Sequence, residues 1–231
     1  MGGVGHGYTR GMYVPDYFVP DEADVLELLR HPAAVELVTS TGVGLLATML
    51  PMAWDEPGSR PGLGEHGALL GHLARKNAQW QEAPIGEAMA IVRGPDAYIS
   101  PTWYATKREH GRVVPTWNYV TIQAHGRLVV HDDVEWLERN VRRLTEMHEG
   151  VRSAPWSVDD APRAYVEGQL RAIVGVELLL DRLEAKAKLS QNRSSEDVNG
   201  VIGGLEADGE GGVSAAMRAT RDTPDDRAER P

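Results

Sequence analysis

Short apolar runs separated by turn residues dominate the chain between residues 34 and 131. The runs are too short for typical helices and are rich in β-branched and aromatic residues, as strands are. They predict strands over 34–40, 43–51, 67–73, 87–93, 96–100 and 117–131. Turn signals stand at Thr41-Gly42 and Gly94-Pro95, and Gly126 interrupts the last run.

Helical periodicity marks three other segments. The segment 20–32 has acidic residues near its start and ends at a proline. The segment 132–150 is strongly amphipathic and ends at a glycine, and a shorter helix is expected over 161–173. A last strand is predicted over 174–182, followed by a polar loop over 184–193.

This order of elements is inconsistent with a regular alternation of strands and helices. Six or seven strands cluster before the main helical segment, so a Rossmann fold is not expected. We predict a mainly β fold with helices (α+β), in which an antiparallel barrel carries a few packed helices. The chain is divided into a flexible leader (1–11), a folded domain (12–193), a helical extension (194–219) and a disordered tail (220–231). Six glycines between Gly200 and Gly212 disfavour the helices of the extension.

Composition narrows the class of protein. The chain has 231 residues, 42% of them apolar, which is ordinary for a folded protein. No apolar run approaches the roughly 20 residues that span a membrane, and no signal peptide is recognisable, so we expect a cytoplasmic protein. The absence of cysteine excludes disulfides, thiol nucleophiles and iron–sulfur clusters. The eight histidines are scattered, and no metal site is expected.

The net charge of −10 bears on possible partners. Proteins that grip DNA through its phosphates usually carry a basic face, so the acidic total argues against a large DNA footprint. It leaves room for a small local one. Half of the excess lies in residues 196–231, which hold nine acids and four bases.

Two segments place polar groups where a plain barrel would not need them. In Gly71–Trp80, the residues Arg75, Lys76 and Asn77 stand between a strand and a short helix, an arrangement that suits an anion. The alternative is a solvated basic turn. In Gly94–Tyr104, the aromatic residues could wall a flat pocket or form a structural corner, and the corner is slightly favoured.

Two further segments have the same character. In Val114–Gly126, Thr116 and Asn118 share one face of a strand and Trp117 shares the other with Tyr119. His125 is read as a structural histidine in preference to a ligand contact. In Lys186–Arg193, amide side chains and three cations crowd together after the last strand, either as a binding loop or as a helix-capping loop.

Several common motifs are absent. The sequence contains no GxGxxG, no GxxxxGK[ST] and no GxSxG. Nothing assembles a catalytic triad or a helix-turn-helix, and no residue stands out as a general acid or base.

The segments "MYVPDYF", "ATMLP", "GHLARKNAQW", "GPDAYISPTWY", "VPTWNY" with "AHG", and "KLSQNR" together resemble a known family. In this order, between Met12 and about Met217, they are similar to the PaiB-like FMN-binding negative transcriptional regulators. The resemblance implies an FMN-binding split barrel related to pyridoxamine-phosphate oxidases. It also implies a homodimer with the flavin at the subunit interface.

The resemblance implies roles for residues that match the family's motifs. Arg75, Lys76 and Asn77 would bind the FMN phosphate with help from Thr48, and His72 would lie near the same pocket. The ribityl chain or the ring would contact Ser100, Thr116, Trp117 and Asn118, while the site would be closed by Lys188 and Gln191.

The chain departs from the family pattern at two positions. Met49 stands where the family often has histidine, and Ala78 stands where it often has proline, which puts cofactor retention in question. The first functional hypothesis is a flavin-dependent transcriptional regulator that acts through a partner or through a weak or indirect DNA contact. The others are an FMN-dependent oxidoreductase acting on a small molecule, and a flavin-storage or scaffold dimer.

Overall fold

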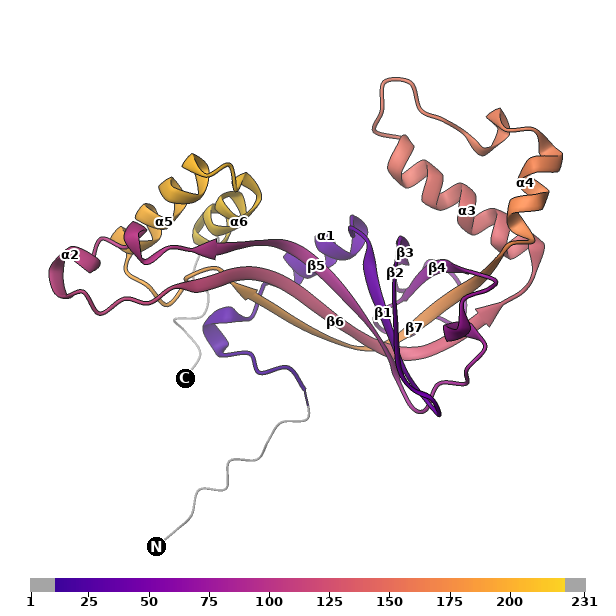
Figure 1. Cartoon of the computed structure of the whole chain (residues 1–231), viewed down its shortest axis with the longest axis horizontal. Coiled ribbons are helices and arrows are strands. Elements are labelled where there is room, and N and C mark those ends of the chain that lie inside the picture. The colour runs from indigo at the N-terminus through magenta and orange to yellow at the C-terminus, as the bar shows by residue number, and fades with distance from the viewer. Residues whose placement is uncertain (1–10, 223–231) are drawn as a thin grey trace, which may run out of the picture. The chain divides into compact units, whose positions relative to one another are not determined.

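The computed structural model describes residues 11–222, and its centre is one sheet of seven strands (Figure 1). The strands are β1 (Val35–Thr41), β2 (Gly44–Leu50), β3 (Met52–Asp55), β4 (Ala68–Ala74), β5 (Ala88–Ile99), β6 (Thr116–His131) and β7 (Ile173–Lys188). Their order in the sheet is β2-β1-β5-β6-β7-β4-β3. The pairs β1–β2, β1–β5, β3–β4 and β4–β7 are all antiparallel. The sheet is not closed, because β2 and β3 remain its two edges.

Helices connect and flank these strands. They are α1 (Glu22–Arg30), α2 (Lys107–His110), α3 (Val134–Glu149), α4 (Arg163–Leu170), α5 (Ser195–Ala207) and α6 (Gly211–Asp222). The 3-10 turns are η1 (Asp16–Phe18), η2 (Ala78–Trp80), η3 (Pro101–Trp103) and η4 (Val158–Asp160). The mainly β fold with helices is therefore confirmed. Positions 1–10 of the predicted leader and 223–231 of the predicted tail lie outside the described residues.

Three strands differ from the prediction. Strand β5 continues through Gly94-Pro95, because β1 pairs with β5 only at residues 89–91 and the missing N–H of Pro95 breaks no bond to β1. Strand β7 extends to Lys188, so the first half of the predicted loop 184–193 is strand. Strand β3 was not predicted as a separate element.

The sequence predicted an interruption at Gly126, but β6 runs through this residue without a break. A Cβ at this position would fall on the backbone carbonyl of Leu179 in β7. The glycine therefore lets two backbones approach closely within a continuous strand.

The chain divides into two compact units, with boundaries inside β5, β6 and β7. Unit 1 comprises residues 1–21, 94–121 and 185–231, and unit 2 comprises residues 22–93 and 122–184. In unit 1, a core of apolar side chains joins the ends of the strands to α5 and α6. Its larger buried members are Ile99, Tyr104, Leu189, Val198, Val201, Ile202, Leu205, Val213 and Met217.

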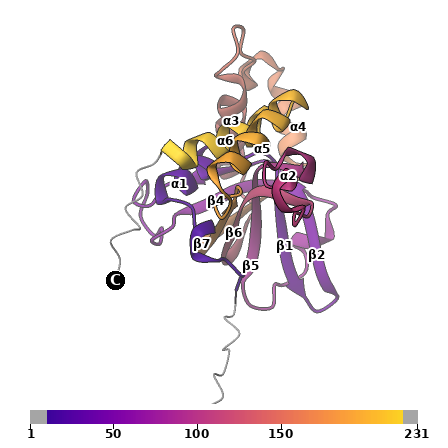
Figure 2. The ribbon, with the colours of Figure 1, turned by 90° about the vertical axis from the view of Figure 1, so that its left-hand side faces the viewer.

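The glycines of α5 explain why this helix forms despite its composition. A Cβ at Gly200 would meet the backbone oxygen of Trp103, and one at Gly204 would meet the Trp103 ring. Both glycines are thus contact points that let Trp103 pack onto the helix. The helix gains more from this packing than it loses in propensity, and α5 and α6 lie side by side in both views (Figure 2).

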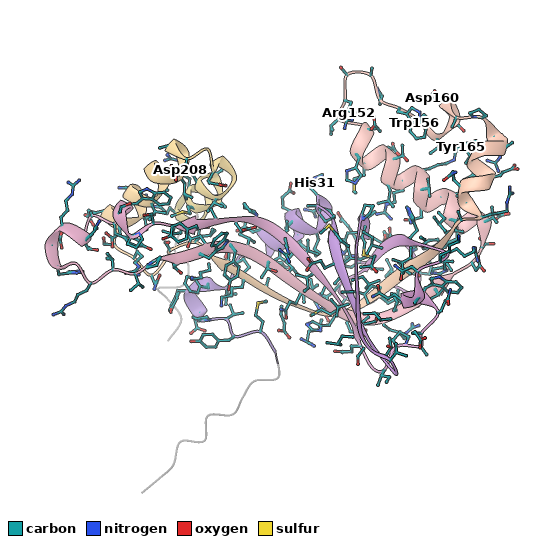
Figure 3. The ribbon with its side chains drawn as sticks, viewed as in Figure 1. His31, Arg152, Trp156, Asp160, Tyr165 and Asp208 are labelled. Atoms are coloured by element: carbon teal, nitrogen blue, oxygen red, sulfur yellow. The ribbon has the colours of Figure 1, made fainter. Side chains whose placement is uncertain are left out.

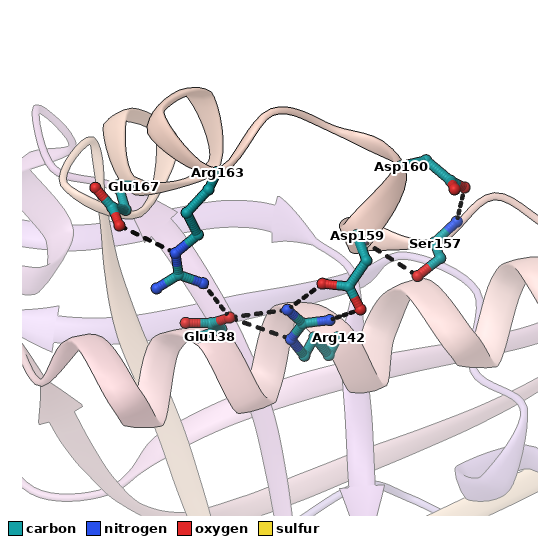
Figure 4. Close-up of polar contacts among 7 residues, drawn as sticks. All are labelled: Glu138, Arg142, Ser157, Asp159, Asp160, Arg163 and Glu167. Carbon is teal, nitrogen blue, oxygen red and sulfur yellow. Dashed lines mark hydrogen bonds and ion pairs between the residues drawn. The ribbon is translucent and has the colours of Figure 1, made fainter.

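In unit 2, a small apolar cluster under α3 and α4 consists of Leu137, Val158, Val166 and Leu170. A ladder of ion pairs links α3 to η4 and α4 (Figure 4). Arg142 on α3 forms ion pairs with Glu138 and Asp159. Glu138 also forms an ion pair with Arg163, at 2.7 Å. These contacts hold the connection between α3 and α4 against α3.

A substitution at Gly126 tests the close approach of β6 and β7. Gly126→Ala is expected to destabilise the protein by about 1–3 kcal/mol, because a methyl group must displace backbone in a packed sheet. Urea unfolding followed by circular dichroism measures the change. The control is Gly42→Ala, where nothing lies within 4 Å of the added carbon. Equal stability of the two variants would contradict the close approach.

Candidate functional site

The loop after β4 is fixed by Arg75. Its guanidinium donates to both carboxylate oxygens of Asp132, with Nη1 to Oδ2 at 3.0 Å, and to the backbone carbonyls of Arg171 at 2.8 Å and Ile173 at 3.0 Å. The hydrogen bond between Arg75 and Asp132 lowers the pKa of the Asp132 carboxyl and raises the pKa of the Arg75 guanidinium. Arg75 therefore positions the loop with most of its donors. Its predicted contact with phosphate stays a prediction.

Asn77 and Thr48 come together, as expected for residues on neighbouring segments. Asn77 Nδ2 donates to Thr48 Oγ1 at 3.0 Å, and Asn77 Oδ1 accepts from the N–H of Gln79 at 2.9 Å, which caps η2. The side-chain bond joins the loop to β2. Thr48 keeps its hydroxyl hydrogen and Asn77 keeps one amide hydrogen, both without an acceptor among residues 11–222.

Other donors on this loop are also available. Lys76 is exposed and has no carboxylate partner in the described part of the chain. The backbone N–H groups of Lys76 and Ala78 have no acceptor there either. We name this set the 75–78 cradle: the backbone of residues 75–78 with the side chains of Lys76, Asn77 and Thr48. A phosphate dianion accepts hydrogen bonds from ammonium groups, amide N–H groups and hydroxyls. The cradle offers all three kinds of donor, so its residues fit the FMN phosphate.

The two departures from the family pattern do not remove donors from the cradle. Met49 is 67% exposed and alternates with Thr48 along β2, so it points to the opposite face of the sheet. A histidine there would also point away from the cradle. Ala78 retains a backbone N–H that a proline would lack.

His72, on β4, makes no hydrogen bond to the cradle. Its Nδ1 is buried and unpartnered among the described residues, and burial lowers the pKa of the imidazole. The ring is therefore neutral near pH 7. Its predicted role in the pocket is not tested by these contacts.

Gln79 is a positioning residue that sequence reasoning missed. It is 2% exposed, and its Nε2 lies 2.9 Å from the carbonyl oxygen of Leu37 and 3.2 Å from Thr39 Oγ1. These bonds attach η2 to β1. No local sequence signal distinguishes such a glutamine from an exposed one, because its partners lie about 40 residues away.

In unit 1, the structure brings Lys188, Thr116 and Trp117 together. Lys188 Nζ donates to Thr116 Oγ1, and to the carbonyl oxygen of Trp117 at 2.9 Å. Burial, followed by the nearby charges of Lys186 and Arg193, lowers the pKa of Lys188. The Trp117 ring is 48% exposed and packs edge-on against Tyr98, with centroids 6.2 Å apart. This set combines a cation, a hydroxyl and an aromatic surface.

Three other predicted residues are occupied by structural bonds. Ser100 caps η3. Asn118 is fully buried and bonds Ser190 Oγ at 3.0 Å. Gln191 donates to the carbonyl oxygen of Ala187 at 2.6 Å and accepts from the N–H of Leu189 at 2.7 Å. Their cofactor roles stay predictions.

The segment around Tyr104 forms the structural corner that the sequence slightly favoured. Tyr104 is 2% exposed and belongs to the core of unit 1, as does the half-buried Trp103. His125, in unit 2, is half-buried, and burial lowers its pKa. It lies 3.9 Å from Glu184.

Within the described part of the chain, no group of three or more histidine, cysteine or acidic side chains could hold a metal ion. Among residues 11–222, no helix is long and apolar enough to cross a membrane.

An antiparallel open barrel with a donor-lined loop defines a class, the split-barrel flavin-binding domains. Residues 12–182 match the model of a family described as "Putative FMN-binding domain". A solved structure titled as the FAD and heme binding protein from Mycobacterium smegmatis shares the fold, with a TM-score of 0.51 and 13% identity over 80% of each chain.

Relatives identify the type more narrowly. The "Protease synthase and sporulation protein PAI 2" of Bacillus subtilis is 31% identical over 83% of this chain and 87% of its own length. An uncharacterized protein of Emericella nidulans is 33% identical over 68% of this chain and 73% of its own. The chain belongs to the PaiB-like family of FMN-binding split-barrel proteins. This confirms the prediction of FMN as the cofactor.

The unpartnered His72 makes stability depend on pH. Below about pH 6.5 the unfolded chain binds a proton at this histidine that the folded protein resists, so the free energy of unfolding falls as the pH falls. His72→Gln is expected to make this dependence shallower between pH 7 and pH 5, as measured by urea unfolding. The control is His31→Gln, at an exposed position just after α1 (Figure 3). An unchanged slope in His72→Gln would contradict the prediction.

Proposed function

We propose that this protein is a flavin-dependent transcriptional regulator of the PaiB type, and that the 75–78 cradle holds the phosphate of FMN. The observation that carries the proposal is the cradle's set of unsatisfied donors next to a loop that Arg75 fixes. A fixed loop offers its donors without losing further conformational entropy on binding. FMN, when bound, supplies the redox chemistry of its isoalloxazine ring.

The residues of the cradle and its loop have different roles in this proposal. Lys76 and the N–H groups of Lys76 and Ala78 bind the phosphate oxygens, with Thr48 and Asn77 at the side. Arg75 acts mainly by anchoring the loop to Asp132, while its remaining Nη1 hydrogen faces no described acceptor.

On the family resemblance, and not on how the two units are placed, contacts with the ribityl chain or the ring are assigned to Thr116, Trp117 and Lys188 in unit 1. Thr116 and Lys188 supply a hydroxyl and an ammonium group, and the exposed Trp117 ring offers a surface for stacking. Ser100, Asn118 and Gln191 hold the backbone that carries these groups. His72 contributes a neutral imidazole.

The outer face of strands β2, β1 and β5 supports a homodimer. Leu45 and Met49 are 76% and 67% exposed on this face. The antiparallel registers place Val38 of β1 beside Ala47 of β2 and Met89 of β5. We name the patch formed by Val38, Leu45, Ala47, Met49, Met89 and Ile91 the outer apolar face. The same face also carries Glu36, which stands between Met49 and Ile91 and pairs with Arg93, and Ser40 beside Leu45. We assign the contact with a second copy of the chain to the exposed apolar side chains of this mixed face.

The regulatory part of the proposal rests on the named relative. PAI 2 of Bacillus subtilis carries sporulation and protease synthesis in its name. The proposal also places the protein in the cytoplasm, where a regulator has access to a gene. A weak or indirect DNA contact is consistent with a chain of net charge −10.

Comparing FMN with riboflavin, which lacks the phosphate, tests the cradle. The double variant Lys76→Ala, Thr48→Val is expected to bind FMN about tenfold to a hundredfold more weakly, because a charge-assisted bond contributes about 1.5–3 kcal/mol. Its riboflavin affinity should be unchanged. Quenching of flavin fluorescence measures both.

The control for this experiment is Arg139→Ala, which removes an exposed cation of α3 outside the cradle. Phosphate binding at the cradle would be contradicted if the double variant bound FMN and riboflavin more weakly by the same factor, or if it bound both as tightly as the wild type. Steady consumption of NAD(P)H by flavin-loaded wild-type protein would favour an oxidoreductase over a regulator.

Two charges on the outer apolar face test the homodimer. Leu45→Glu with Met49→Glu is expected to turn a dimer into a monomer in sedimentation velocity, because buried unpaired carboxylates oppose association. The matched control, Val134→Glu with Val151→Glu, changes exposed positions around α3 by the same charge. A monomeric wild-type protein, or a double variant that remains dimeric, would contradict the assignment of this face.

A further inference from the structure

Charge is unevenly distributed along this acidic chain. Residues 94–121 and 185–193, both in unit 1, together contain six lysines and arginines and two acids, a balance of +4. The remaining residues carry −14, since the whole chain carries −10. The rest of unit 1, residues 1–21 and 194–231, carries −6, so the positive balance is confined to these two segments.

Half of these cations lie on one short connection between β5 and β6. We name residues 107–112 the α2 loop. It carries Lys107, Arg108 and Arg112, together with His110 and a single acid, Glu109. All five side chains are exposed. Within residues 11–222, no carboxylate pairs with the two arginines or the lysine, whereas Arg142 and Arg143 in α3 both have acidic partners.

The α2 loop is held in place at its base by α5. Asp197 is 2% exposed and accepts from the N–H of Thr106 at 2.9 Å and from its hydroxyl at 2.8 Å. Trp103, just before, packs onto Gly200 and Gly204. At the other end, Gly111 closes α2 with a φ of 65°. Figure 2 shows α2 beside α5.

We propose that the α2 loop binds the phosphate backbone of nucleic acid. Guanidinium and ammonium groups that have no internal partner are free to replace the counterions of phosphates. The exposed part of the loop offers cations and an imidazole and no apolar pocket, so it recognises density of negative charge. A nucleic acid backbone presents that density in a regular array, which an acidic peptide does not.

This contact is independent of base sequence, because the charged groups assigned to it meet phosphates, which carry no sequence information. The inference rests on the proposed regulatory function for its meaning, since it gives that function a place to touch DNA. The physical argument is the charge and the fixed base of the loop.

The test is the binding of a short, fluorescently labelled duplex DNA of arbitrary sequence, followed by anisotropy at several salt concentrations. The triple variant Lys107→Ala, Arg108→Ala, Arg112→Ala should bind at least about tenfold more weakly at low salt. Its slope of log affinity against log salt should be smaller by about 2–3, at about 0.9 for each lost phosphate contact.

The matched control, Arg139→Ala, Arg152→Ala, Arg171→Ala, removes three exposed arginines from unit 2 and changes the net charge equally. Equal loss in both triple variants would overturn the inference, since total charge would then explain binding. So would absence of binding by the wild type, or displacement of the duplex by polyglutamate at equal charge concentration. Thermal unfolding of each variant establishes that it folds.

Flavin binding, measured on the same samples, separates this inference from the proposed function. FMN binding without duplex binding would overturn the inference alone. Duplex binding that depends on the α2 loop, in a protein that binds no flavin, would overturn the flavin-dependent function alone.

Discussion

The ion pair between Arg75 and Asp132 is the constraint on which the proposed cofactor site depends. Four bonds from one guanidinium fix the first residue of the loop to Asp132, just before α3, and to the carbonyls of Arg171 and Ile173 at the start of β7. The bonds of Asn77 and Gln79 then fix the end of the loop to β2 and β1. The four bonds of Arg75 make it a poor candidate for the main phosphate ligand, and leave that task to its neighbours Lys76 and Asn77.

The pattern of apolar and polar residues predicted those strands and helices that depend mainly on their own sequence. Strands of alternating burial such as β1, and the amphipathic α3, lie where the apolar pattern placed them. The extents of β5 and β7 could not be read in the same way, because Gly94-Pro95 and the polar residues 184–188 are tolerated only where particular neighbours pair with them. Gly126 was predicted to break a strand, and Gly200 was counted among the glycines that disfavour a helix. What they make room for, Leu179 and Trp103, is distant in sequence.

The candidate site also contains residues that the sequence could identify and residues whose roles depend on distant partners. The resemblance placed Thr48 beside the loop that carries Asn77, and the structure has the two side chains in contact. The resemblance assigned Thr116 and Lys188 separately to the cofactor, and their direct contact with each other was not predicted. The structural bonds of Asn118 and Gln191 were not predicted either, because an amide in a polar segment gives no sign of whether its partner is a ligand or the chain itself. Gln79 shows the opposite error, a buried polar anchor that passed for an ordinary residue.

The central claim is that this chain, with its Met49 and Ala78, still holds FMN. The visible absorption spectrum of the purified protein, recorded before and after FMN is added and the sample is desalted, tests it most directly. The account predicts that stoichiometric flavin absorbance survives desalting, since neither substitution removes a donor from the 75–78 cradle. A colourless protein that cannot be loaded would contradict it.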